Sequence, residues 1–409
     1  MRMLANVAPM RALAIAAMAS LVASLGGCGG GGGDSGSNNT PPNVMPTQNV
    51  QPVTVDQGPG GYPNLLFTSV TICGPGGSAT CATIDHIQID TGSSGLRIMS
   101  SALPANVPLR QLTDANGNAI VECAQFADGF TWGPVMIADI RLAGEVATSI
   151  PVQVIGDPRF PNIPASCSNI GPPQQTPDAF GANGLLGIGL FIEDCGAACV
   201  QSAIAGAYYV CAVAGCQPAR VIAAQQVQNP VAAFATDNNG VVITLPSIPA
   251  TGAPSAVGSL IFGIGTQADN AANGVTVLQT DPNTGHITTV FNNQTYMTSY
   301  IDSGSNGLFF GNGVFPSCPP PDNDFYCPAT TQSFTATLRG TNGASANVNF
   351  LVANADQLNL NFYAFNDLAG PTFDTTTFAW GLPFFYGRSV FTAIEGRSTP
   401  VGTGPFVAF

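Results

Sequence analysis

Residues 89–96 read IDTGSSGL, and residues 301–308 read IDSGSNGL, so two short stretches of the chain agree at six of their eight positions. Their acids, Asp90 and Asp302, lie 212 residues apart (302 − 90), which is the length of a domain and not the period of a solenoid. The two similar octapeptides therefore predict an internal duplication in which each copy lies at the centre of one lobe.

The rest of the chain has the pattern of a β-rich protein. Apolar and β-branched runs of strand length alternate with breaks of Gly, Pro and Asn. The chain has 409 residues, 45% of them hydrophobic, which is enough for two globular units. Short helices are expected mainly in the Ala-rich stretch 197–235. The sequence thus predicts a mostly β fold with a few short helices.

The N-terminal stretch has the form of an export signal. Arg2 and Arg11 precede an apolar run from residue 12 to residue 25, which is short for a membrane span. The end of this stretch, Leu-Gly-Gly-Cys28, resembles the lipobox of bacterial lipoproteins, in which cleavage leaves a lipidated Cys. We therefore expect a lipoprotein signal peptide at 1–27 and a lipid anchor at Cys28. The alternative is an ordinary secretory signal in which Cys28 is incidental.

The segment after Cys28 is rich in Gly, Ser, Pro and Asn, so we expect residues 28–60 to form a flexible tether. The folded part would then begin near Tyr62. This arrangement predicts a protein of the bacterial cell envelope, on the periplasmic or surface face of the outer membrane. Its contact with the membrane would be made through the N-terminal lipid only.

Cysteine usage agrees with export. Eleven Cys are present, and assigning Cys28 to the lipid leaves ten, an even number that suits disulfides in an oxidising compartment. A zinc site is disfavoured because the only histidines are His86 and His286, so we expect no metal and no cofactor. The spacing allows local bridges and leaves the pairing open; the candidate pairs are Cys73 with Cys81, Cys195 with Cys199, Cys211 with Cys216, Cys318 with Cys327, and Cys123 with Cys167.

The charge of the chain excludes one class of partner. The net charge is −13, the pI is about 4.2, and all ten basic residues are Arg. Such a surface repels nucleic acid and offers no basic stripe that could follow phosphates. We expect a monomer that binds no nucleic acid.

The duplicated motif suits the hydrolysis of an amide without a metal or a covalent nucleophile. Such chemistry needs one group to take a proton from water and another to give one to the carbonyl oxygen. Two carboxylates held about 3 Å apart do both, because their repulsion makes them share one proton. Gly92 and Gly304, which follow the acids, allow a tight turn and let backbone N–H groups approach the carboxylates.

The motif also carries a family resemblance. Asp90-Thr91-Gly92-Ser93 and Asp302-Ser303-Gly304-Ser305 resemble the two active-site loops of bilobal, pepsin-like aspartic peptidases. The resemblance implies that Asp90 and Asp302 are catalytic. It also implies that the hydroxyls of Thr91 and Ser303 cross-brace the loops, and that those of Ser93 and Ser305 bond the outer carboxylate oxygens.

Further segments occur in the order that this family has. Residues 183–189 resemble the strand beneath the first loop, residues 379–381 its partner, and residues 258–263 the strand that enters the C-terminal lobe. The likeness runs from about Tyr62 to Phe409. It implies a pepsin-like bilobal fold with an N-terminal lobe at 61–257 and a C-terminal lobe at 258–409.

The chain departs from the family at the flap, the hairpin that covers the substrate. Phe126-Ala127-Asp128-Gly129-Phe130 stands at that place, which makes Phe126, Asp128 and Gly129 the flap candidates. The family usually has Tyr where Phe126 stands and Trp where Arg97 stands, although Arg97 could stack on Phe126 as a cation–π pair. The stretch 195–216 resembles an insertion.

These features favour an exported, lipid-anchored aspartic-type endopeptidase that prefers acid and cleaves peptide or protein substrates. The alternative is a lipoprotein that keeps the fold without the reaction and binds a peptide or an envelope polymer. A third hypothesis, a structural or adhesive surface protein, leaves the duplicated motif unexplained. Glycosidases also use two carboxylates, but the hydroxyl-bearing turns beside Asp90 and Asp302 favour the peptidase. The chain has no Gly-x-Ser-x-Gly elbow.

Overall fold

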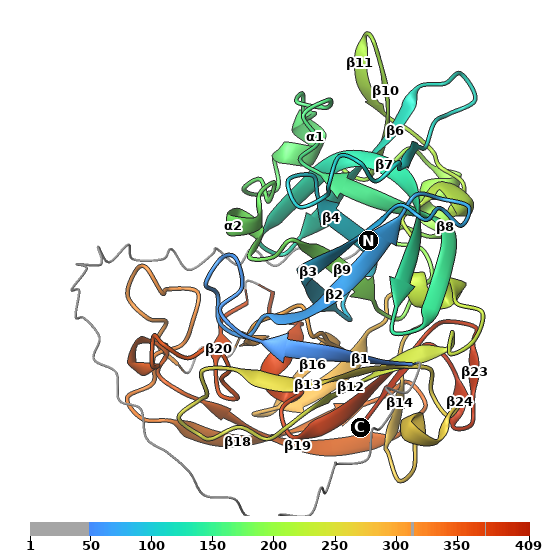
Figure 1. The fold of residues 1–409 in the computed structure, drawn as a ribbon. Coiled ribbons are helices and arrows are strands. Elements are labelled where there is room, and N and C mark those ends of the chain that lie inside the picture. Colours follow the sequence, from blue (N-terminus) through green and yellow to red (C-terminus); the bar gives the residue numbers. More distant parts are fainter. Residues whose placement is uncertain (1–48, 312–314, 373) are drawn as a thin grey trace, which may run out of the picture.

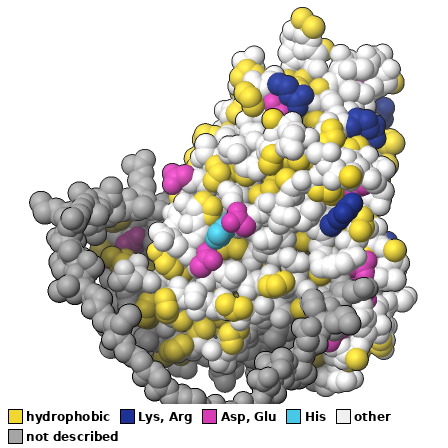
Figure 2. Space-filling view, in the orientation of Figure 1, with side chains coloured by type: hydrophobic (Ala, Val, Ile, Leu, Met, Phe, Trp, Pro, Cys, Tyr) yellow, Lys and Arg dark blue, Asp and Glu magenta, His cyan; other side chains and the backbone are white. Residues whose placement is uncertain are grey.

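The computed structural model describes residues 49–311, 315–372 and 374–409 and shows a mostly β protein (Figure 1). The expected signal peptide 1–27, the expected anchor Cys28 and most of the expected tether lie outside the described residues. Within the described ranges, no helix is both long and apolar enough to cross a membrane. On the face drawn in Figure 2 most side chains are uncharged, and the Arg side chains stand apart from one another without forming a stripe.

Most described strands belong to one large sheet of 16 strands. The first eight, in spatial order, are β11 (Gly215–Pro218), β10 (Tyr208–Ala212), β6 (Ala119–Phe126), β7 (Gly129–Leu142), β8 (Glu145–Ile155), β4 (Ser94–Met99), β9 (Gly184–Ile188) and β3 (Cys81–Asp90). The path continues through β2 (Leu66–Cys73), β1 (Val50–Val55), β13 (Ala256–Phe262), β12 (Gly240–Leu245), β22 (Arg388–Ala393), β25 (Phe406–Ala408) and β14 (Val277–Gln279), and β5 (Arg110–Gln111) pairs with β7.

A second sheet and a few short helices complete the described part. The order in the second sheet is β19 (Ser345–Val352), β18 (Gln332–Arg339), β15 (Ile287–Phe291), β16 (Gln294–Ile301), β21 (Phe378–Trp380), β17 (Leu308–Phe310) and β20 (Ala369–Gly370). A separate hairpin joins β23 (Ser398–Thr399) and β24 (Gly402–Thr403). The helices are α1 (Ala165–Ser168), α2 (Pro177–Phe180) and α3 (Ala197–Gln201), with 3₁₀ turns η1 (Ala223–Gln225), η2 (Pro230–Ala233), η3 (Ala268–Asn270), η4 (Ala355–Gln357) and η5 (Leu382–Phe384).

The two octapeptides sit in the same local arrangement of strands. Strand β3 ends at Asp90 and runs parallel to β9, β4 runs antiparallel to the other edge of β9, and β8 lies parallel beyond β4. Strand β16 likewise runs parallel to β21, β17 antiparallel to it, and β20 parallel beyond β17. The duplication inferred from the sequence is therefore matched by a repeated four-strand unit, and each unit delivers one acid.

Both acid-bearing stretches are anchored in the hydrophobic core by apolar side chains. Ile89 and Ile301, which precede the two acids, are buried in the main core. The fully buried Trp380 stacks on Phe378 with ring centroids 4.2 Å apart. Its backbone carbonyl accepts from the N–H of Asp302 at 2.9 Å. Packing of this density fixes the loops to rigid strands.

The start of the folded part differs from the expectation. Residues 28–60 were expected to form a tether, but β1 lies inside that range, between β2 and β13. Val53 and Val55 of β1 are fully buried. The sheet is also continuous across the expected boundary at 257/258, because β12 pairs with both β13 and β22. Composition did not predict this strand because the sequence before residue 53 is polar and rich in Pro.

The stretch 197–235, where short helices were expected, contains both helices and strands. The stretch 197–235 contains α3, η1 and η2, but it also contains the β10–β11 hairpin, which was not expected. All five candidate disulfides are present: Cys73–Cys81, Cys123–Cys167, Cys195–Cys199, Cys211–Cys216 and Cys318–Cys327. Cys123–Cys167 connects β6 to α1 and spans 44 residues of sequence. The hairpin extends the sheet at the open edge of β6.

We predict that the fold requires β1. A chain that begins at Tyr62 loses the backbone hydrogen bonds of β1 and two buried Val side chains, a loss of about 5 kcal/mol or more, which is comparable to the stability of a whole domain. A chain that begins at Asn49 keeps them. Denaturant unfolding followed by circular dichroism compares the two. Equal midpoints would show that residues 49–61 are a tether after all.

Candidate active site

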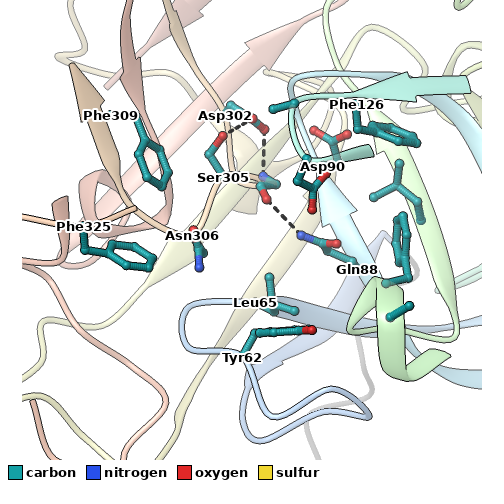
Figure 3. A pocket seen from close by; sticks show the side chains of 16 residues that line it. Tyr62, Leu65, Gln88, Asp90, Phe126, Asp302, Ser305, Asn306, Phe309 and Phe325 are labelled. Atoms are coloured by element: carbon teal, nitrogen blue, oxygen red, sulfur yellow. Dashed lines mark hydrogen bonds between the residues drawn. The ribbon is translucent and has the colours of Figure 1, made fainter. Parts of the chain in front are cut away.

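The loops that follow β3 and β16 bring Asp90 and Asp302 together beside one pocket (Figure 3). The backbone N–H of Gly92 donates to Asp90 Oδ1 at 2.7 Å and also to Asp302 Oδ1 at 3.0 Å. The N–H of Gly304 donates to Asp302 Oδ1 at 2.7 Å. Two acids far apart in the sequence thus form one pair.

Only glycine fits beside each acid. A Cβ added to Gly92 would lie 2.6 Å from Cγ of Asp302, and one added to Gly304 would lie 2.7 Å from Oδ1 of Asp90. Both distances are well inside van der Waals contact, so any other residue would push the carboxylates apart. The two glycines therefore limit how closely the loops and the acids can approach, in addition to the turn and the N–H contacts that the sequence predicts.

The hydroxyl groups of the two loops occupy the positions that the family resemblance implies. Ser93 Oγ donates to Asp90 Oδ2, and Ser305 Oγ donates to Asp302 Oδ2 at 2.8 Å. Each outer carboxylate oxygen therefore has its own donor, which stabilises the charged form of the pair.

A second set of bonds joins the loops to each other. The N–H of Ser303 donates to Thr91 Oγ1 at 3.0 Å, and the N–H of Thr91 donates to Ser303 Oγ at 3.2 Å. Ser303 Oγ in turn donates to the carbonyl of Ile89 at 2.9 Å. Thr91 and Ser303 are buried. This reciprocal brace fixes the distance between the two acids.

The electrostatics of the pair favour a single shared proton. Burial, the charge of Asp90 and the hydrogen bond between the two side chains raise the pKa of Asp302 well above its ordinary value of 3.8. Both side chains are buried, with 6% exposed for Asp90 and 9% for Asp302. One carboxyl group can therefore hold a proton while its neighbour is ionised, which is the state that acid–base catalysis needs.

A pocket of about 160 Å³ opens above the pair (Figure 3). Its lining is mainly apolar and aromatic, which suits the side chains of an extended peptide. Gln88 also lines it and donates from Nε2 to the carbonyl of Gly304 at 3.0 Å. The apolar lining comprises Tyr62, Leu65, Phe126, Phe180, Leu185, Phe309 and Phe325.

A hairpin of β6 and β7 lines the pocket at residues 126–130, where the family resemblance implies a flap. Phe126 pairs with Gly129 at its tip, and Phe126 and Asp128 line the pocket. Burial raises the pKa of Asp128 to about 6, and Gln174 Nε2 donates to Asp128 Oδ2 at 3.1 Å. The predicted stacking is also present, with Arg97 Cζ 5.9 Å from the centre of the Phe126 ring.

A buried group of charges that was not predicted from the sequence lies behind this hairpin. Arg97 Nη2 donates to Glu122 Oε1 at 2.5 Å and to Asp194 Oδ2 at 3.2 Å. The available signal was Glu122 itself, a lone acid inside the apolar run AIVECAQF, which is unusual for a buried strand.

Across the described residues, one group of side chains lies close enough together to hold a metal ion: Cys318, Cys327 and Asp356. Cys318 and Cys327 are joined in a disulfide, which removes both thiolates as ligands.

Comparison with known protein families gives a match over most of the chain. Residues 45–409 match the profile of a family described as "Protein of unknown function (DUF3443)". The match includes both acids and all the strands described above. No curated protein matches the chain. The description names no activity.

We predict that acid stabilises the fold through Asp302. The folded protein keeps a proton on this group above its ordinary pKa of 3.8, whereas the unfolded chain releases it. The free energy of unfolding therefore falls as the pH rises from that value through the raised pKa. Thermal unfolding from about pH 4 to about pH 7 measures the slope. The Asp302→Asn variant, which cannot ionise there, should show a shallower slope; an unchanged slope would assign the effect to the overall negative charge.

We also predict that the brace is worth more than the outer bonds. Ser303→Ala removes the acceptor of Thr91 N–H and the donor to the Ile89 carbonyl at a buried position, and it should lower the free energy of unfolding by about 3 kcal/mol. Ser305→Ala removes one bond at a half-buried position and should cost about 1 kcal/mol. Denaturant titration compares the two serines. Equal losses would mean that the loops do not depend on the brace.

Proposed function

We propose that this chain, which belongs to the DUF3443 family, is an exported, lipid-anchored aspartic-type endopeptidase with a bilobal, pepsin-like fold. The observation that carries the proposal is the bond from Gly92 N–H to both Asp90 Oδ1 and Asp302 Oδ1. Like charges are brought this close only where the surroundings supply donors and a proton. Such an arrangement has a direct use in acid–base chemistry.

The proposed reaction uses one water and the shared proton. Asp90 is the ionised carboxyl group and takes a proton from the water. At the same time, the oxygen of the water attacks the carbonyl carbon of the peptide. The protonated group, Asp302, gives its proton to the carbonyl oxygen, and a diol forms. The proton on Asp90 then passes to the amide nitrogen, the C–N bond breaks, and a diol hydroxyl returns its proton to Asp302. The products are a carboxylic acid and an amine, and the pair again holds one proton.

The pocket supports a peptide as the substrate. Phe126 and Phe309 line it together with the acid pair, so an extended chain in the pocket would place apolar side chains next to the bond that is cut. Residues 126–130 would act as the flap. Apolar side chains beside the scissile bond are therefore the expected preference.

The repeated four-strand unit supports the bilobal part of the proposal. One unit, built around β3 and β9, carries Asp90, and the other, built around β16 and β21, carries Asp302. Two related lobes that each contribute one acid across a central cleft are the arrangement that the family resemblance implies. Strands β1, β13 and β12 would then connect the lobes.

Five disulfides support export. Bridges of this kind persist in oxidising compartments such as the bacterial periplasm or the cell surface. The proposed lipid anchor, Cys28, would attach the folded part to the envelope membrane.

A second candidate is a binding protein without catalysis. The observation in its favour is the pair of Phe126 and Arg97, which stack without the hydrogen bond that the family resemblance implies between these two positions. In that case the pocket would hold a peptide or an envelope polymer, and the acid pair would serve only structure.

We predict that the purified protein cleaves a peptide library between about pH 3 and about pH 7, with most activity in acid. Asp90→Asn and Asp302→Asn should each lower cleavage by at least about a hundredfold, because either change removes the proton exchange. Asp356→Asn, at an exposed acid remote in sequence from the pair, is the matched control and should cut like the parent.

Mass spectrometry of the products distinguishes the candidates. Cleavage by the parent and by Asp356→Asn alone supports the peptidase. The same background from all four proteins would reject catalysis and leave the binding protein.

A further inference from the structure

A buried charged cluster lies behind the β6–β7 hairpin. We name it the Arg97 cluster, and its members are Arg97, Glu122, Asp194 and Tyr208. The side chain of Arg97 is 3% exposed, that of Glu122 1% and that of Asp194 12%. A buried charge group of this kind is seldom needed for stability, because apolar side chains of similar volume do as well or better. Stability alone therefore does not explain why these charged side chains are buried next to the pocket.

Arg97 connects the two parts of the site. Its Nη1 donates to the carbonyl of Ser94 at 2.9 Å, at the start of β4, directly after the loop that carries Asp90. Its guanidinium lies 5.9 Å from the centre of the Phe126 ring, which lines the pocket. One side chain thus contacts both the residue that follows the first acid loop and the tip of the β6–β7 hairpin.

The cluster also connects the β6–β7 hairpin to the β10–β11 hairpin. Tyr208 on β10 pairs with Glu122 on β6 along the backbone, and its hydroxyl donates to Asp194 Oδ1 at 2.6 Å. The same hydroxyl accepts from the N–H of Val227 at 2.7 Å. Titratable groups from three neighbouring segments face Glu122: Arg97 from β4, Asp194 from the segment after β9, and Tyr208 from β10.

The charges of the cluster balance only when one acid is protonated. A single guanidinium faces two carboxyl groups, so ionisation of both would leave a buried net negative charge. Burial, together with the charge and the hydrogen bond of Asp194, raises the pKa of Glu122 well above its ordinary value of 4.5. Glu122 therefore keeps its proton in acid and releases it as the pH rises, and the two carboxylates then repel each other.

We propose that Arg97 is a positioning residue that holds Phe126 over the acid pair, and that the Arg97 cluster is closed when Glu122 carries a proton and loosened when Glu122 ionises. The cluster would make the hairpin an acid-dependent lid. This rests on the proposed function of Asp90 and Asp302, since it describes the regulation of that site. The hairpin tip would be rigid at the pH at which the pair works best and mobile near neutrality.

Amide hydrogen exchange of residues 119–126, corrected for the intrinsic rate, tests the mechanism without reference to catalysis. Exchange in the parent should be roughly tenfold faster at about pH 7 than at about pH 4. Glu122→Gln, which keeps the shape without a titrating group, should stay slow at both. Arg97→Met leaves the acids unpaired and should be fast at both.

The matched control for Arg97 is Arg159→Met. Arg159 also bonds an aspartate, Asp157, and lies over a phenylalanine, Phe160, but its side chain is 58% exposed. Its loss should leave the exchange of residues 119–126 as in the parent, because an exposed ion pair contributes little.

Activity supplies the second readout. Arg97→Met should lower kcat/KM by roughly tenfold or more, mainly through KM, because the lid that holds the peptide is lost. Glu122→Gln should match the parent in acid and keep its activity to higher pH. Asp90→Asn should abolish cleavage and leave the exchange unchanged.

The two proposals fail separately. If no protein cleaves peptides, the proposed function fails and the exchange still decides the role of the cluster. The cluster proposal is overturned if Glu122→Gln keeps the pH dependence of the parent, or if Arg97→Met and Arg159→Met exchange alike. Should Arg97→Met not fold, the comparison of Glu122→Gln with the parent still decides it.

Discussion

The contact between Asp90 and Asp302 is the constraint on which the rest of the site depends. Two like charges in a buried place repel unless donors and a proton offset them. Gly92 and Gly304 supply N–H groups at close range, and Ser93 and Ser305 supply hydroxyls. These donors must themselves be held, and the repeated four-strand units hold them. The requirement for one close pair of acids thus explains the duplicated octapeptide, its glycines and its hydroxyls together.

The sequence predicted those parts of the molecule that depend on local chemistry. The tight turns at the two glycines follow from residue types within a few positions, whereas the roles of the hydroxyls and the hairpin at residues 126–130 are implied by the family resemblance. The disulfides were predictable because four of the five pairs are separated by nine residues or fewer, which left Cys123 and Cys167 for each other. Short separations leave few alternatives, so spacing alone carries much information.

Features that depend on long-range pairing were not predictable. Strand β1 gains its stability from β13, about 200 residues further on, and its own residues include Pro52 and polar side chains. The Arg97 cluster draws its members from β4, β6, β10 and the segment after β9, so no window of the sequence contains it. Register between distant strands is set by the whole fold, and single-sequence patterns do not encode it.

Two of the few charged residues of this chain share the same kind of environment. Only 8% of the residues are charged, yet two acids, Asp302 and Glu122, are buried where a second acid raises the pKa. Both carboxyl groups therefore bind a proton more tightly in the folded state than in the unfolded one, and both favour the fold in acid. One proton would equip the pair for catalysis, and the other would hold the hairpin above it. A common dependence on protonation would let the chemistry and the lid respond to the same change of pH without any further signal.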